Sequence, residues 1–229
     1  MNIDAAVTAI HQGDVNGLKK LLDEDPGLAT ARLAGKREAR TLLHVATDWP
    51  GHFPNGAATV ATLIDSGADV NAPFTGKHTE TPLHWAASSG DVAALDALLD
   101  GGANIEATGA VIGGGTPLAD AVAFGQWNAA RRLVERGARS TLGQAAALGL
   151  MNRVEEHFAQ GIPSQEEVTK AFWNACHGGQ RRTAEYLLAR GADLNWVGWD
   201  GLTPLDAANR SGAAEVVDWL RAQGATATP

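Results

Sequence analysis

Cysteine and tyrosine are almost absent from the sequence, which has one residue of each among its 229. A single cysteine cannot form a disulfide within the chain, and this is typical of proteins in a reducing compartment. No apolar run approaches the roughly 18 residues that a membrane-spanning helix needs. The first residues, MNIDAAVTAI, lack the basic and apolar segments of a secretory signal. We therefore expect a soluble, cytoplasmic protein with no membrane partner.

Basic residues are in the minority as well: 18 Lys and Arg stand against 26 Asp and Glu, and the net charge is −8. A net-negative surface does not attract phosphate backbones, so we expect no nucleic-acid partner. Hydrophobic residues make up 45% of the chain. This content is enough for a core in one domain or one continuous array.

What the sequence has is internal repetition. A Gly-Ala pair recurs in SGADVNA, GGANIEA, RGARST, RGADLNW and QGATATP, and the successive glycines are 35, 35, 54 and 33 residues apart. The longest interval contains a further Gly at position 161. A second motif precedes most of these pairs and reads TLLHVA, TPLHWAA, TPLADAV and TPLDAAN. A fixed period of this length indicates stacked structural repeats.

Residues 79–107 show how one repeat is expected to fold. Thr81 is suited to cap a helix, with Pro82 in its first turn where the missing N–H does no harm. Gly90 permits a tight turn, and an apolar stripe then marks a second helix. Gly102 is suited to end that helix in a left-handed conformation.

These motifs resemble the ankyrin repeat: a Thr-Pro-Leu-His-x-Ala helix start, a glycine turn, a second helix and then Gly-Ala-Asp-x-Asn. The resemblance covers nearly the whole chain. It implies an all-α ankyrin-repeat solenoid with short β-hairpin tips and a concave groove of first helices and hairpin tips. It also implies a non-catalytic module that binds another protein through that groove.

The repeats are interpreted as one domain over residues 1–229. The first repeat has no hairpin and is expected to be the N-terminal cap, the fifth is degenerate, and the last closes the array. Their approximate ranges are 3–31, 40–72, 73–107, 108–140, 141–162, 163–195 and 196–229.

The second repeat departs from the pattern after its first helix. Asp48 and Trp49 align with the two residues before the turn glycine Gly90 of the next repeat, and Asn55 takes the place of Gly90. Residues 50–54, PGHFP, are therefore an insertion. Two prolines restrict this loop, so we expect a rigid wall at one end of the groove.

The candidate binding residues are the aromatic, histidine and acidic side chains that the alignment places at this surface. In the ankyrin family the two residues before the turn glycine face the groove, and the hairpin tips flank it. Aromatic side chains are frequent anchors of binding surfaces. The candidates are Asp48, Trp49, His52, Phe53, His78, Glu80, Trp85, Phe124, His177, Trp196 and Trp199.

Other notable residues have structural interpretations. His44 and His84 occupy the motif position whose histidine is structural in the family and bonds to neighbouring turns. Cys176 replaces a small alanine and is expected to be buried. Trp173 is expected to wedge between repeats. No cofactor and no metal site are expected.

An alternative function stays open. The insertion and the long hairpins would then close the groove into a pocket that binds a small molecule or performs acid/base chemistry. Its catalytic groups would be Asp48 with His52 or His78, since a histidine titrates near neutral pH. The favoured interpretation is a monomeric scaffold that recognises a protein partner without catalysis.

Overall fold

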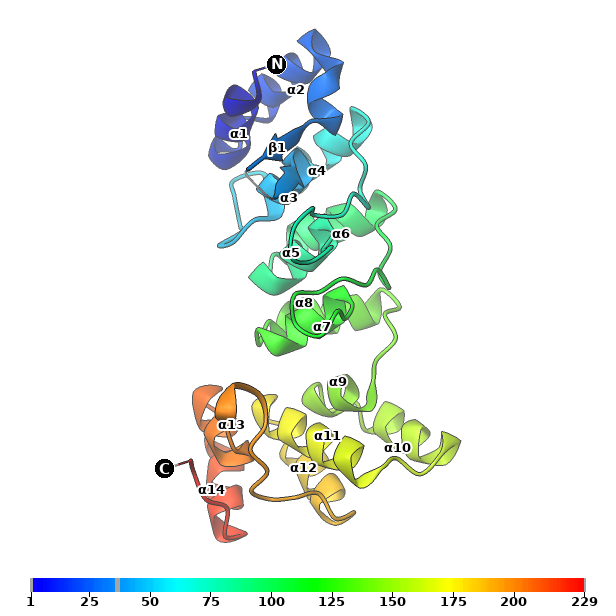
Figure 1. The fold of residues 1–229 in the computed structure, drawn as a ribbon, viewed down its shortest axis with the longest axis vertical. Helices are drawn as coiled ribbons and strands as arrows, with labels where there is room; N and C mark the ends of the chain where they lie inside the picture. Colours follow the sequence, from blue (N-terminus) through cyan, green and yellow to red (C-terminus); the bar gives the residue numbers. More distant parts are fainter. Residues whose placement is uncertain (1, 36–37, 229) are drawn as a thin grey trace. The chain divides into compact units, whose positions relative to one another are not determined.

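The computed structural model describes residues 2–35 and 38–228 of the chain (Figure 1). The fold consists of paired antiparallel helices joined by short turns. Residue contacts divide the chain into two compact units, Met1–Ala138 and Arg139–Pro229. The division falls at the start of the degenerate fifth repeat, and each unit is described separately below. The assignment of one domain to the whole chain stays a prediction.

The first unit contains four helix pairs arranged in two rows (Figure 1). The inner helices α3, α5 and α7 pack side by side, with α1 against α3, and the outer helices α2, α4, α6 and α8 form the second row. Their bounds are α1 Ile3–Gln12, α2 Val15–Glu24, α3 Leu42–Thr47, α4 Gly56–Asp65, α5 Pro82–Ser89, α6 Val92–Asp100, α7 Pro117–Ala123 and α8 Trp127–Glu135; a 3₁₀ turn, η1, spans Pro26–Thr30.

The second unit repeats this plan. The inner helices α9, α11 and α13 pack in one row, and the outer helix α12 packs against α14. Their bounds are α9 Leu142–Ala147, α10 Met151–Gln160, α11 Gln165–His177, α12 Arg181–Leu188, α13 Pro204–Arg210 and α14 Ala214–Ala222; a 3₁₀ turn, η2, spans Trp199–Gly201. The core here centres on Phe172 and on Cys176, both fully buried. Burial raises the pKa of the Cys176 thiol, so this cysteine is a packing residue, as the sequence predicts.

Buried histidines start two inner helices and join neighbouring repeats. Thr41 and Thr81 adopt the extended conformation of an N-cap, and the Nδ1 atom of the histidine three residues later faces the threonine N–H. The opposite ring nitrogen reaches a carbonyl of the next repeat: 3.1 Å from His44 to Glu80 and 3.3 Å from His84 to Gly115. Burial lowers the pKa of His44 to about 4 and also lowers that of His84. Both rings are therefore neutral structural links at pH 7.

A β-hairpin that the sequence analysis did not identify follows η1. Strands β1 Arg32–Ala34 and β2 Ala39–Thr41 pair antiparallel, with Arg32 opposite Thr41. Three-residue strands carry too little alternation to be identified from sequence. The hairpin and residues 74–80, 109–115 and 195–202 are called fingers 1, 2, 3 and 4 from here on.

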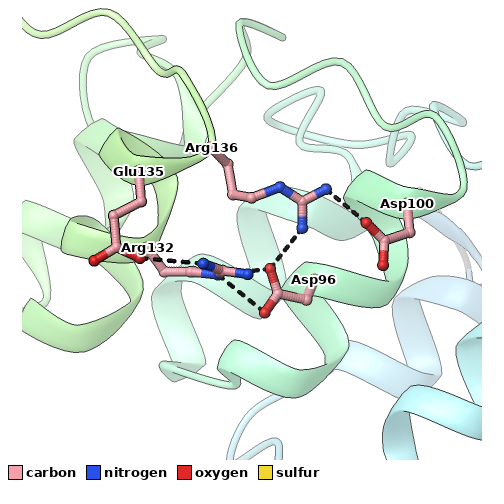
Figure 2. Close-up of polar contacts among 5 residues, drawn as sticks. All are labelled: Asp96, Asp100, Arg132, Glu135 and Arg136. Carbon is pink, nitrogen blue, oxygen red and sulfur yellow. Dashed lines mark hydrogen bonds and ion pairs between the residues drawn. The ribbon is translucent and has the colours of Figure 1, made fainter.

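An ion-pair cluster ties the outer helices α6 and α8 together (Figure 2). Asp96 accepts from Arg132 at 2.8 Å and from Arg136 at 2.7 Å, and Arg136 also reaches Asp100 at 2.6 Å. Glu135 holds the other side of Arg132 at 3.1 Å. All five side chains are partly exposed to solvent, so their ion pairs add little to the stability. Their main effect is to fix how α6 and α8 align.

Close helix packing in the second unit predicts a strict requirement for glycine at position 178. A Cβ atom there would lie 1.9 Å from the carbonyl oxygen of Ala147, whereas a Cβ on Gly161 meets nothing within 4 Å. We expect Gly178→Ala to lower the free energy of unfolding by about 1–3 kcal/mol, because backbone must move. Gly161→Ala should stay within about 0.5 kcal/mol of wild type. Urea unfolding of both variants tests this, and equal midpoints would contradict the packing described.

Candidate binding surface

The inserted loop after α3 is fastened on both sides. Toward the first repeat, the Asn55 side chain donates to the Gly13 carbonyl at 2.9 Å, and Phe53 stacks on His11 with ring centroids 4.8 Å apart. Toward the third repeat, the backbone N–H of His52 donates to Asp91 at 2.8 Å. Asn55 has φ 54°, the left-handed conformation that the alignment with Gly90 requires. The loop is therefore a brace across three repeats.

The brace leaves one of its aromatic side chains in solvent. Trp49 is 80% exposed. By contrast, His52 places its Nε2 atom 3.3 Å from the Ser89 carbonyl, and Phe53 is half-buried against His11. Asp48 forms an ion pair with Arg40 of finger 1. Trp49 is thus the residue of this segment best placed to meet a partner.

Glu80 joins fingers 2 and 3 to helix α5. The residue is buried, with 7% of its surface exposed. Its carboxylate accepts hydrogen bonds from the Trp85 indole at 2.8 Å and from the Val111 backbone N–H at 2.6 Å. The Nδ1 atom of His78 lies 3.3 Å from the same carboxylate. The Glu80 carbonyl accepts from the Phe74 backbone N–H at 2.7 Å. Glu80, which was predicted as a binding residue, therefore holds fingers 2 and 3 in position through its hydrogen bonds.

An aromatic group surrounds Glu80. The Trp85 ring lies edge-on to His44 at 4.9 Å and tilted against Phe74 at 5.7 Å, and Phe74 stacks on His78 at 4.4 Å. Beside it is a recess of about 380 Å³ between finger 1 and the rings of Phe74 and Trp85. Its remaining lining is Leu33, Ala34, Gly35, Glu38, Ala39 and Arg40.

The three residues proposed for acid/base chemistry contact different neighbours. Asp48 is paired with Arg40, His52 faces Ser89, and His78 lies between Phe74 and Glu80. No hydrogen bond, ion pair or ring contact joins any two of these three described residues, and none lines the recess. In the described part of the chain, no group of three or more His, Cys, Asp or Glu is arranged to hold a metal ion.

Asp120 is a buried acid that the sequence analysis missed. It lies on α7 at the position that Trp85 holds in α5, is 1% exposed, and neither carboxylate oxygen has a hydrogen-bond partner. Burial, and then the negative charge of Glu80, raise the pKa of Asp120 to about 8. The signal was present in the motif, because TPLADAV places an acid where the other motifs have Val, Trp or Ala.

Aromatic residues also gather in the second unit, on finger 4 and the inner helices. Trp199 lies edge-on to Trp173 at 4.9 Å and to Trp196 at 5.5 Å. The buried Trp173 indole donates to the Leu202 carbonyl at 2.9 Å, as expected for a residue wedged between repeats. Trp199 remains 41% exposed. The cluster therefore fixes finger 4 and presents one indole to solvent.

His177 was predicted to point into the groove, but it is buried and only 6% exposed. Its Nδ1 atom lies 2.9 Å from the Ser211 hydroxyl, and its ring packs against Trp173 at 5.4 Å. The physical reason is that the His177 ring is packed against Trp173 of its own helix and contacts Ser211 at the end of α13, so side-chain packing with the next repeat covers it. A direct contact of this side chain with a partner is therefore not part of the surface described.

The exposed large apolar residues occupy similar places in the repeats of the two units. Among the described residues, six of the seven are on finger tips or at the C-terminal ends of inner helices, and the seventh, Ile162, is in the loop before α11. The six are Trp49, Val111, Ile112, Phe124, Val197 and Trp199. Together they are called the recognition residues below. Trp49, Phe124 and Trp199 are among the predicted binding residues, and the other three lie in fingers 3 and 4.

Comparisons with known proteins agree with this architecture of helix pairs and fingers. A family model described as ankyrin repeats in three copies matches residues 55–144. An ankyrin repeat and KH domain-containing protein of Caenorhabditis briggsae is 30% identical over 188 residues, which is 77% of this chain. The match spans only 7% of that much longer protein.

A solved structure, the human ASB11 ankyrin repeat domain, superposes with a TM-score of 0.55 at 21% identity, covering 94% of this chain and 96% of that one. The chain is an ankyrin-repeat protein, and its fold is an all-α ankyrin solenoid. Ankyrin repeats are generally modules of protein–protein interaction. Of the helices that the structure describes, none is long and apolar enough to cross a lipid bilayer.

The link through Glu80 predicts a graded effect of substitution. Glu80→Ala leaves two N–H donors without their acceptor and should lower the free energy of unfolding by about 2–3 kcal/mol. Glu80→Gln keeps one acceptor oxygen and should cost about half as much. Urea unfolding gives both values, and the Trp85 indole proton resonance should shift in both variants. An alanine variant as stable as wild type would show that the carboxylate does not hold finger 3.

The unpaired Asp120 predicts a stability that depends on pH. Because its folded pKa is raised from 3.8 to about 8, the folded state is disfavoured progressively as pH rises through this window. Asp120→Asn removes the titration, so the variant should be more stable than wild type at pH 7, by up to about 4 kcal/mol. Near pH 4 the two proteins should match.

Unfolding curves from pH 4 to pH 8 provide the measurement, with Asp65→Asn as a control because Asp65 is exposed. The control should show no such divergence from wild type. A difference between Asp120→Asn and wild type that is constant across this range would contradict the assignment.

Proposed function

We propose that this chain is a non-catalytic recognition scaffold whose partner protein contacts the recognition residues. The observation that supports it best is the concentration of exposed large apolar side chains on fingers and inner-helix ends. Among the described residues, the outer helices expose none of this kind. Within each unit, exposed apolar side chains gathered on an otherwise polar surface indicate a binding site.

The geometry of these residues suits recognition. Three of the six are carried by segments that the fold holds in place: Trp49 by the brace, Val111 by its hydrogen bond to Glu80, and Trp199 by the tryptophan cluster. Rigid side chains lose little conformational entropy on binding, so more of the contact energy remains as affinity. The acid/base alternative has no comparable support, because Asp48, His52 and His78 are engaged with different neighbours.

The test begins with capture of partners from the host's own cells and continues with purified proteins. Trp49→Ala and Trp199→Ala, one in each unit, should each weaken the partner's affinity by at least about 30-fold, which corresponds to about 2 kcal/mol for a central aromatic anchor. Calorimetric titration provides the affinities, and thermal unfolding verifies that each variant is folded.

The matched control is Arg182→Ala on the outer helix α12. Arg182 is exposed, and arginine is frequent among binding anchors, so this control is demanding. It should leave the affinity unchanged. If Arg182→Ala weakened binding and both tryptophan variants bound like wild type, the proposed surface would be wrong.

A further inference from the structure

Fingers 1 and 2 form a single structural piece with a recess beside it. The backbone N–H of Ala39 donates to the Thr75 carbonyl at 2.8 Å, and the N–H of Thr75 donates back to Ala39 at 2.9 Å. The recess of about 380 Å³ is lined by residues of finger 1 and by Phe74 and Trp85. Ligand pockets in proteins begin at about 300 Å³, so this recess can hold one long side chain of a partner.

Among the described residues, the lining carries one uncompensated charge, and that charge is negative. The two charged lining residues are Glu38 and Arg40. Arg40 forms an ion pair with Asp48, whereas the exposed Glu38 carboxylate has no ion pair or hydrogen bond within the described part of the chain. The exposed cations Arg32 and Lys77 of the two fingers do not line the recess. The described lining therefore favours a cationic group over an anionic one.

The acidic side chain lies beside an aromatic ring of the recess. A Cβ atom on Gly76 would lie 2.5 Å from the Cε1 atom of Phe74 and 3.3 Å from the Cγ atom of Glu38, so the two side chains approach the same point of finger 2. The Trp85 indole N–H is committed to Glu80, and Trp85 therefore offers the recess its apolar ring. Aromatic rings attract cations through their electron-rich faces. Rings and a carboxylate together suit a positively charged side chain.

The second unit contains the same combination of groups with an arginine that the chain itself supplies. Arg210 lies over the Trp173 ring, 6.0 Å from its centroid, and pairs with Asp200 at 2.6 Å. In the recess of the first unit the rings and the acid are present, but the arginine of the described lining, Arg40, is held by Asp48. A planar guanidinium can stack on a ring and also pair with a carboxylate, which a lysine ammonium does less well. An arginine from outside would complete the combination.

We propose that the recess binds an arginine side chain presented by a linear segment of a partner protein. The guanidinium lies against the Phe74 and Trp85 rings and pairs with Glu38. This inference rests on the proposed function and names the chemistry of the partner. A nucleic acid is a poor occupant, because the described lining offers its phosphate groups no uncompensated cation.

The test uses three blocked peptides that differ at one position: acetyl-Gly-Ala-Arg-Ala-Gly-amide, its citrulline analogue, which is neutral and of similar shape, and its glutamate analogue. In NMR titrations the arginine peptide should shift the amide resonances of residues 38–40 and 74–76 and reach saturation. The citrulline peptide should bind at least about fivefold more weakly, because it loses both the cation–ring contact and the ion pair. The Hδ protons of the bound arginine should move upfield, because an aromatic ring shields protons that lie over its face.

The glutamate peptide checks the sign of the charge preference. Lys36 and Arg37 follow Gly35 in the sequence and lie outside the described residues. If they made the recess favour an anion, the glutamate peptide would bind more tightly than the arginine peptide. We expect the reverse, with no saturation by the glutamate peptide. Added salt should weaken binding of the arginine peptide, as for a partly exposed ion pair.

Substitution of the acid locates the contact. Glu38→Gln should weaken binding of the arginine peptide by about threefold, the size expected for one exposed ion pair. The fold is expected to be kept, because the Glu38 side chain is exposed and has no partner within the described part of the chain. The matched control is Glu155→Gln on the outer helix α10, where the acid is likewise exposed. This control should bind the peptide like wild type.

The inference is wrong if no peptide binds, if the citrulline or glutamate peptide binds as tightly as the arginine peptide, or if Glu38→Gln leaves the affinity unchanged. Self-association of the wild type that Glu38→Gln abolishes would make a second copy the occupant and would also overturn it. A captured partner that depends on Trp49 or Trp199 but not on Glu38 would sink this inference and leave the proposed function standing. Dependence on Glu38 but on neither tryptophan would support the arginine site and contradict the wider surface.

Discussion

The hydrogen bond from each motif histidine to the next finger is the constraint on which the surface of the first unit depends. His44 and His84 begin their helices and also hold a backbone carbonyl of the following repeat, at Glu80 and Gly115. Because both rings are buried and have lowered pKa values, they stay neutral near pH 7 and these hydrogen bonds are kept. Glu80 extends the first link through its side chain to Trp85 and Val111. Helix start, finger position and exposed tip residues are thereby set by one chain of bonds.

Repetition made much of this predictable. The threonine caps, the structural histidines, the burial of Cys176 and the left-handed Asn55 each follow from comparing one repeat with another. The hairpin β1–β2 escaped prediction because three-residue strands leave almost no periodic signal. The side-chain directions at His52, Phe53 and His177 escaped because they depend on partners far along the sequence: Ser89, His11 and Ser211. Alignment of repeats places a backbone position, but packing decides whether its side chain reaches solvent.

The insertion after α3 and the acid at position 120 are two departures from the repeat pattern. The insertion adds stabilising contacts, whereas the buried acid lowers the stability of the folded state. The insertion forms bonds to the first and third repeats and leaves Trp49 exposed. Asp120 forms no side-chain hydrogen bond and replaces an apolar residue in the core. The negative charge of Glu80 adds to the effect of burial in raising the pKa of Asp120. An unsatisfied buried acid is uncommon in native proteins, so this position is a cost to stability that the repeat pattern alone does not explain.

Hydrogen–deuterium exchange of this chain, alone and with its purified partner, tests most directly the claim that fingers and inner-helix ends form the contact. The account predicts slower exchange on binding at residues 48–53, in fingers 2 and 3, and in finger 4, with the outer helices α4, α6, α8 and α12 unchanged. Amides that exchange through local opening slow down when a partner covers their segment, so the exchange rates locate the contact along the chain. Protection confined to the outer helices would contradict the account and move recognition to the opposite face of the repeats.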